Sequence, residues 1–158
     1  MTREIILSNS QISYIDEDDF ELVNQFRWYP LVNPNITYAN SPHTNTLMHR
    51  LILGLNSEDK RLVDHKDRNG LNNQRSNLRI ATRSQNGFNY PPTEGSYKGV
   101  SWDAAREKWK AQIMIDRKQI NIGRFDDPIE AAKAYDRIAK ERLGEFAYLN
   151  FSELEGIG

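Results

Sequence analysis

The segment VDHKDRNGLNNQRSNLRIATRSQNGFN, residues 63–89, decides how the first part of this chain is read. It is dense in asparagine and arginine and contains one histidine, and the formation of a core does not explain that composition. Asparagines suit turns, so the plainest interpretation is a turn-rich hairpin with no chemical role. The adjacent pair Asp64-His65 is harder to explain in that way, because a carboxylate beside an imidazole is typical of a catalytic site.

Asp64 and Asn86 supply oxygen ligands, and His65 supplies a base. A carboxylate is a hard ligand for a divalent cation, and a histidine with an ordinary pKa of about 6.5 can take a proton from water at neutral pH. The amide oxygen of Asn86 is a neutral hard ligand that joins Asp64 if the chain folds back through a hairpin. Both parts of metal-assisted hydrolysis are therefore present. Four other asparagines compete for the ligand role: Asn69, Asn72, Asn73 and Asn89. Spacing does not exclude Asn89.

These residues resemble a known motif. Asp64-His65, Asn77-Leu78-Arg79 and Asn86 are similar to the HNH motif of phage and intron-encoded homing endonucleases, in the subgroup that ends in asparagine. The preceding stretch Met48-His49-Arg50-Leu51-Ile52 also resembles segments found before that motif. The resemblance implies a ββα-metal finger over about residues 60–90, in which a strand ends at the Asp-His pair and a helix carries the last ligand.

The resemblance also implies a role for each motif residue. Asp64 and Asn86 would hold one magnesium or manganese ion, His65 would be the general base, and Asn77 would orient His65 or brace the loop. Zinc is less suitable, because Asn86 stands where many members have a histidine. The implied reaction is hydrolysis of a phosphodiester bond of duplex DNA, which leaves 5′-phosphate and 3′-hydroxyl ends.

Other histidine, aspartate and arginine residues in or near the motif are less strongly indicated as functional residues. His49 lies in an apolar run and is expected to be structural, and His43 is assigned no role. Asp67 could be a second carboxylate ligand, but an exposed turn aspartate is the simpler reading. Four basic residues around the motif could contact phosphates near the scissile bond: Arg68, Arg75, Arg79 and Arg83. For Arg79, a structural role is the alternative.

The C-terminal part has the pattern of a small sheet followed by a helix. Apolar and polar residues alternate over 109–115, which predicts a half-buried strand, and 97–102 and 119–125 supply two flanking strands. Asp127-Pro128-Ile129-Glu130 combines an N-cap, a proline at the first helical position and a glutamate three residues after the cap. A helix should start there and end near Gly144. The expected module is βββα, with a three-stranded antiparallel sheet packed on one helix.

This module resembles the plant ethylene-response-factor (ERF, Apetala-type) DNA-binding domain, through Tyr97-Lys-Gly-Val100, Trp109-Lys-Ala-Gln-Ile113, Ile122-Gly-Arg-Phe-Asp126 and Leu149-Asn-Phe151. The resemblance implies that the sheet enters the major groove with the helix behind it. The groove-facing positions would include Lys98, Ser101, Arg106, Lys108, Lys110, Gln112, Met114 and Asn121. Because Ser101, Met114 and Asn121 depart from the plant pattern, the plant target sequence does not transfer.

Within this module, residue chemistry separates phosphate contacts from base contacts. Lys108, Lys110 and Arg117 are expected to contact phosphates, while Gln112 and Asn121 are suited to adenine edges.

The two tryptophans of this module differ in how clearly they can be assigned. Trp109 is in phase with the apolar strand positions and should lie in the core. Trp102 could either stack on a base or fill the core.

These patterns predict an α+β protein with two domains. The nuclease domain should span 1–90, a linker 91–96, and the DNA-binding domain 97–152. Within the first domain we expect short strands over 4–14 and 36–53, and a short helix within 16–28. The Pro- and Gly-containing peptide at 89–95 motivates the linker, because successive prolines extend neither a helix nor a central strand.

Composition excludes several classes of protein. The chain has 158 residues and no cysteine, which rules out a disulfide framework and thiolate zinc sites. It contains no apolar run long enough for a membrane span and no secretory signal at Met1–Ser10, so we expect an intracellular, cytoplasmic protein with access to DNA. Residues 60–90 hold seven basic and two acidic side chains, and 97–124 hold seven and three. Such basic stretches favour a nucleic-acid partner over a small-molecule substrate.

The sequence thus predicts a metal-dependent, homing-type DNA endonuclease from a phage or mobile element, acting as a monomer or weak dimer. A monomer with a single HNH site cuts one strand per docking event, so nicking and double-strand cleavage both remain open. The first alternative is a non-catalytic, sequence-specific DNA-binding regulator in which the nuclease motif persists only as a structural hairpin. A second alternative is an RNA-directed protein, because charge and aromatic residues do not separate RNA from DNA.

Overall fold

The computed structural model describes residues 1–151, and within them the chain is mixed α and β with small antiparallel sheets and few helices, as the expected α+β class requires. It forms two compact units, Met1–Arg83 and the chain from Ser84 onward. The domain limits of 1–90 and 97–152 stay a prediction. Among the described residues, no helix has the length and apolar character needed to cross a membrane.

The first unit begins with an antiparallel hairpin of β1 (Thr2–Ile6) and β2 (Ile12–Asp16). A single 3-10 turn, η1 (Glu17–Asp19), and the short helix α1 (Phe20–Val23) follow it. The helix expected within 16–28 is therefore shorter than that interval. Its end is held by the indole of Trp28, which donates to the carbonyl of Val23 at 2.9 Å. Buried apolar residues from these elements form one core cluster, including Ile5, Ile15 and Val23.

A second sheet and a short helix complete the support for the motif segment. Strands β3 (Tyr29–Val32), β4 (Thr37–Ser41) and β5 (Thr46–Leu47) form an antiparallel sheet in that order. The expectation of strand structure up to residue 53 is wrong for its last part, because Met48–Ile52 is the helix α2. This segment buries its two end residues, Met48 and Ile52, against the core, and burial alone does not distinguish a short buried strand from a short buried helix.

The motif segment forms a hairpin followed by a helix. Strands β6 (Leu62–His65) and β7 (Leu78–Ala81) pair antiparallel, and α3 (Arg83–Phe88) follows β7 in the chain. The loop between the strands passes close to the rest of the first unit at Gly70. A Cβ added there would lie 2.3 Å from the carbonyl oxygen of Thr37, so only glycine fits.

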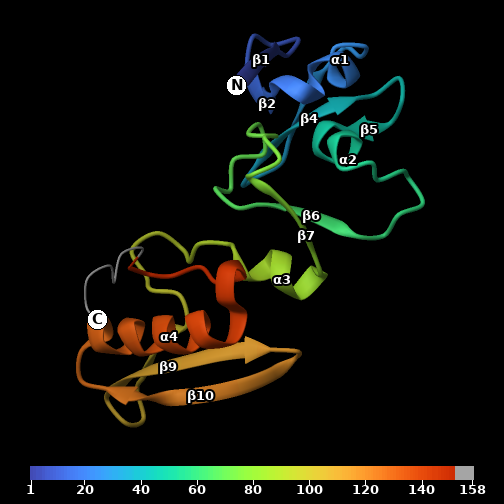
Figure 1. Ribbon diagram of the computed structural model, residues 1–158. Coiled ribbons are helices and arrows are strands. Elements are labelled where there is room, and N and C mark those ends of the chain that lie inside the picture. The colour runs from blue at the N-terminus through green and yellow to red at the C-terminus, as the bar shows by residue number, and fades with distance from the viewer. Residues whose placement is uncertain (152–158) are drawn as a thin grey trace. The chain divides into compact units, whose positions relative to one another are not determined.

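The second unit contains β8 (Val100–Asp103), β9 (Lys108–Ile115) and β10 (Lys118–Phe125), which form an antiparallel sheet with β9 in the middle. Helix α4 (Pro128–Leu143) packs along β9 and β10 (Figure 1). The helix begins where the sequence predicted, since Asp127 is the N-cap and its carboxylate accepts from the Ile129 N–H at 2.9 Å. Gly144 follows its last residue and begins a 3-10 turn, η2 (Gly144–Phe146).

Small residues let α4 lie close to the sheet. Its buried face consists largely of alanines, and Ile113 of β9 packs with Tyr135 and Ala139. Gly99 has a φ of +76°, and a Cβ on it would lie 2.0 Å from the Tyr135 ring, so this position requires glycine for both reasons.

Candidate functional site

Asp64 and His65 end strand β6, and both side chains are buried although both are polar. Asp64 is 5% exposed and His65 is 2% exposed. The antiparallel register places Asp64 opposite Arg79 and His65 opposite Leu78. Because a buried charge is costly unless it is paired, each of these side chains needs a specific partner.

Arg79 is a partner of Asp64. Its Nη2 lies 2.6 Å and its Nε 2.7 Å from the same carboxylate oxygen of Asp64, and both side chains are less than one-tenth exposed. The sequence left a phosphate contact and a structural role open for Arg79, and the structure shows Arg79 in a buried ion pair. The guanidinium thereby stabilises a carboxylate in a position with little access to solvent.

His65 has a buried partner in Asn73. The His65 Nε2 and the Asn73 Oδ1 are 3.0 Å apart, and Asn73 is fully buried. Burial lowers the pKa of His65 below its ordinary value, although the hydrogen bond to Asn73 and the nearby carboxylates act in the opposite direction. The imidazole is therefore neutral at neutral pH, which is the form that can accept a proton.

Two further rings pack against His65. The His49 ring meets it edge to face, with centroids 5.0 Å apart at 90°, and the Tyr38 ring lies 5.7 Å from it. The pKa of His49 is lowered to about 3, first by burial and then by unfavourable Coulomb interactions with His65 and Arg50. Within residues 1–151, the buried His49 Nδ1 has no hydrogen-bond partner. His49 is thus a buried ring packed beside His65, and its structural role stays a prediction.

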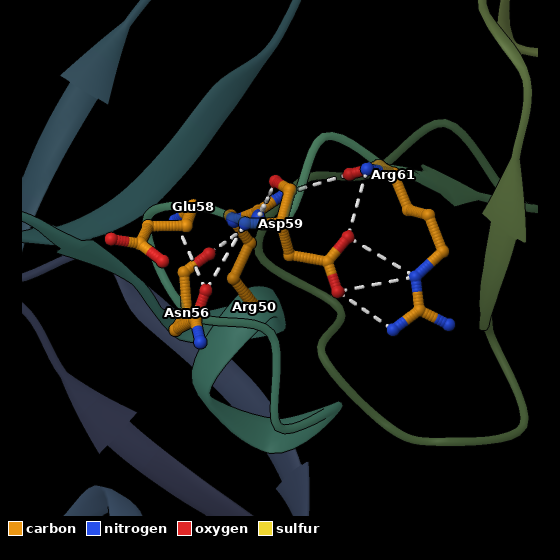
Figure 2. A network of polar contacts seen from close by, with 5 residues as sticks. All are labelled: Arg50, Asn56, Glu58, Asp59 and Arg61. Atoms are coloured by element: carbon orange, nitrogen blue, oxygen red, sulfur yellow. Dashed lines mark hydrogen bonds and ion pairs between the residues drawn. The ribbon is translucent and has the colours of Figure 1, made fainter.

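Arg50, the neighbour of His49 in α2, braces the chain that leads into β6. Its guanidinium donates to three backbone carbonyl oxygens, those of Asn56, Asp59 and Arg61, at 2.9, 2.7 and 2.8 Å (Figure 2). The side chains of Asp59 and Arg61 also form an ion pair, 2.7 Å from Nη2 to Oδ2. These contacts hold the connection between α2 and β6, and so help to place the strand that carries Asp64 and His65.

Asn77 braces the loop between β6 and β7. Its amide nitrogen donates to the Asp67 carboxylate and to the Asn72 carbonyl, both at 2.8 Å, and its amide oxygen accepts from the Asp67 N–H at 3.0 Å. The Asp67 carboxylate also accepts from the Asn69 N–H and from the Asn72 amide. Asp67 is thus an exposed turn residue that organises this loop, as its simpler reading expected.

Asn86 lies in α3, which belongs to the second unit from Ser84 onward, and its side chain is partly buried. Its pairing with Asp64 on one ion stays a prediction. Among residues 1–151 there is no group of three or more His, Cys, Asp or Glu side chains that could hold a metal. A carboxylate together with an amide oxygen nevertheless fits a hard cation such as magnesium or manganese, because these ions take oxygen ligands and keep several waters.

The other basic residues around the motif have different surroundings. Arg75 forms an ion pair with Asp19, 2.7 Å from Nη2 to Oδ1, and the same nitrogen donates to the Ile52 carbonyl at 2.9 Å. Arg75 therefore also clamps two parts of the first unit together. Arg68 in the loop and Arg83 at the start of α3 are exposed.

In the second unit, several predicted DNA contacts share the sheet face opposite α4. Alternation along β9 puts Ala111 and Ile113 on the helix side, and Lys110 and Gln112 on the other. The residues paired with these two across the sheet lie on the same face: Ser101 and Arg124 are opposite Lys110, and Asn121 is opposite Gln112. By alternation along β9, Lys108 and the strongly exposed Met114 also lie on this face. The open face therefore carries seven of these side chains: Ser101, Lys108, Lys110, Gln112, Met114, Asn121 and Arg124. Arg124 was missed by the sequence reasoning. Its place opposite Lys110 depends on a register shift between Asn121 and Gly123 that no local pattern indicated.

Several of these polar side chains have partners within the second unit. Lys108 pairs with Asp126, Gln112 accepts from Gln119, and Arg106 and Arg124 both contact Asp103. Arg117 lies in the turn between β9 and β10 at a φ of +64°.

Lys98 and Trp102 do not belong to the set of side chains that the strand register places on the open face. The ammonium of Lys98 donates to the carbonyl oxygens of Phe88 and Tyr90, so it binds the chain that follows α3. Trp102 pairs with Trp109 across β8 and β9, with ring centroids 5.1 Å apart, and so shares the helix-side face, although it is 50% exposed. Its position favours packing over stacking on a base in the groove.

Comparison with known proteins agrees with both resemblances. A family model for an HNH endonuclease matches residues 47–88, and one for an AP2 domain matches residues 95–145. An uncharacterized HNH endonuclease of Acanthamoeba polyphaga mimivirus is 32% identical over 146 residues, which cover 87% of this chain and 74% of that protein. Protein 3.8 of Escherichia phage T7 is 34% identical over 88 residues, covering 54% of this chain and 72% of that protein. The chain therefore belongs to the HNH endonuclease family, and its HNH segment is followed in sequence by an AP2 domain.

Proposed function

We propose that the protein is a divalent-metal-dependent endonuclease that hydrolyses phosphodiester bonds of duplex DNA. The observation that carries the proposal is the pair at the end of β6, where a buried, neutral imidazole at His65 directly follows a buried carboxylate at Asp64. Both lie inside the segment that matches the HNH endonuclease model. A structural hairpin would not need to bury these two polar side chains next to each other.

The proposed chemistry divides the work between His65 and two oxygen ligands. His65 takes a proton from the attacking water as the new O–P bond forms, and the bond from phosphorus to the 3′ oxygen breaks. The 3′ oxygen then takes a proton from solvent, which leaves 5′-phosphate and 3′-hydroxyl ends. Asp64 and Asn86 would hold one magnesium or manganese ion, which when bound offsets negative charge on the phosphate and the leaving oxygen. Asn77 acts indirectly by bracing the loop that follows His65.

We further propose that the second unit positions the nuclease on DNA through the open face of its sheet. Lys108, Lys110 and Arg124 would contact phosphates, while Gln112 and Asn121 would read adenine edges. The AP2-domain match and the grouping of these side chains on one face support this arrangement. Exposed Arg68 and Arg83 would add phosphate contacts near the cut, and Arg117 one at the end of the sheet.

The first test is DNA cleavage by the His65→Ala variant, with His43→Ala as the matched control because His43 is exposed and outside the site. Wild type and control should nick or cut supercoiled plasmid with magnesium or manganese and stop in chelator. His65→Ala should cleave at least about 100-fold more slowly and still bind DNA. Cleavage by His65→Ala at the wild-type rate would exclude this base. A wild-type protein that binds DNA but cuts it with neither metal would support the non-catalytic regulator instead.

A further inference from the structure

We propose that Asn73 is a positioning residue of this site, whose side-chain amide holds His65 in the tautomer with the proton on Nε2 and so leaves Nδ1 as the proton acceptor. This inference rests on the proposed function of His65 as the base. Asn73 does not touch the reacting atoms in this scheme. It acts through the orientation and the protonation pattern of the imidazole.

The contacts of the Asn73 amide fix its orientation. Its nitrogen lies 2.8 Å from the Ser13 hydroxyl oxygen, and that hydroxyl lies 2.8 Å from the Leu71 carbonyl oxygen. The Met48 sulfur also lies 3.2 Å from this hydroxyl, but a thioether is a weak acceptor, so the single hydroxyl hydrogen is directed at the Leu71 carbonyl, which only accepts. The Ser13 oxygen must then accept from its amide neighbour. That neighbour is therefore the NH₂ group of Asn73. The Gly70 carbonyl, 3.5 Å from the same nitrogen, favours the same assignment.

With the NH₂ group directed at Ser13, the amide oxygen of Asn73 faces the Nε2 of His65 at 3.0 Å. An amide oxygen has no hydrogen to donate, so Nε2 must carry one. A neutral imidazole has a single N–H, and the lone pair is then on Nδ1. The opposite tautomer would place two lone pairs against each other in a buried site, which is costly.

Burial stabilises the hydrogen bond between His65 and Asn73. Asn73 is fully buried and His65 is 2% exposed, so water cannot readily replace either partner. The amide is held on its other side by the hydroxyl of Ser13, which is also fully buried and lies on β2. The ring of His49 packs edge to face against His65 and limits its rotation. The base is thus positioned by residues that come from three separate parts of the first unit.

The direct test is the tautomer of His65 in the intact chain. Histidine-selective ¹⁵N labelling and long-range ¹H–¹⁵N correlation spectra at neutral pH distinguish a protonated ring nitrogen from one with a lone pair, and His65→Ala assigns the signal. We expect the Nε2–H form. An Nδ1–H form, or a doubly protonated ring, would overturn the proposal. The spectrum is independent of cleavage, so an inactive protein with the Nε2–H form would refute the proposed function and leave the positioning intact.

The second test separates positioning from general structure. Asn73→Leu has a similar shape and lacks the acceptor, and Asn24→Leu makes the same change at an exposed asparagine of the first unit. We expect kcat for DNA cleavage to fall about 100-fold in Asn73→Leu, with KM for DNA and manganese binding, measured by electron paramagnetic resonance, unchanged. A folded Asn73→Leu protein with wild-type kcat would overturn the proposal, as would equal losses in kcat, DNA binding and metal binding. If Asn73→Leu does not fold, the wild-type spectrum decides.

Discussion

Acidification should weaken the first unit through His49, whose imidazole is buried with no partner at Nδ1 among residues 1–151. The pKa of His49 in the folded protein is about 3, against an ordinary value of 6.5. As the pH falls below 6.5, the unfolded chain therefore binds a proton at this residue while the folded protein does not. The stabilising contribution is present above the unfolded-state pKa and is lost as the pH falls towards 3.

The size of this loss follows from the linkage relation. Between pH 7 and pH 5, the unfolded state of a histidine with an ordinary pKa gains about 2 kcal/mol of proton-binding free energy. The folded-state pKa lies below this interval, so the folded protein gains almost nothing in return. His49 alone should therefore lower the free energy of unfolding of the first unit by about 2 kcal/mol over these two pH units.

Urea unfolding of His49→Phe at pH 7 and pH 5 measures this contribution. Phenylalanine keeps an aromatic ring against His65 but cannot bind a proton, so the variant should lose about 2 kcal/mol less than wild type between the two pH values. His43→Gln is the control, because His43 is exposed, and it should follow wild type. An identical pH dependence for wild type and His49→Phe would refute the reasoning.

Two other predictions test the charged residues. Replacing Arg79 with methionine should lower the free energy of unfolding of the first unit by about 3 kcal/mol, because it removes the guanidinium that pairs with the buried Asp64 carboxylate. A stable variant that has lost only DNA affinity would instead make Arg79 a phosphate contact. Lys110→Ala should reduce the slope of log affinity against log salt by about 0.9, as expected for one lost phosphate contact. Lys140→Ala, on the exposed side of α4, should leave that slope unchanged; equal slopes for both variants would count against Lys110.

Local sequence patterns were sufficient where the interacting groups are near neighbours in the chain. Asp127 caps α4 and Pro128 opens it, and both effects act within one helical turn. The alternation in β9 likewise predicts its buried and open faces without reference to other strands. Local pattern failed at Met48–Ile52, because a short segment with buried apolar residues suits a strand and a helix equally well.

The candidate site shows the same division. Asp64-His65 was identifiable because a carboxylate beside an imidazole is unusual chemistry. The partners of this pair were not identifiable, because the segment contains several asparagines and arginines of the same chemical type. The contacts that distinguish them are long-range: Asn73 meets Ser13 across sixty positions, and Arg75 meets Asp19 across fifty-six.

The order of the two modules, the start of the last helix and the chemistry carried by Asp64 and His65 were all present in the sequence by itself. Only the tertiary structure decided that Asn73 contacts His65, that Asn77 holds the loop, and that Arg79 pairs with a carboxylate. The physical reason is burial. Hydrogen-bonding capacity is a property of each residue type, but its use depends on which groups folding removes from water together.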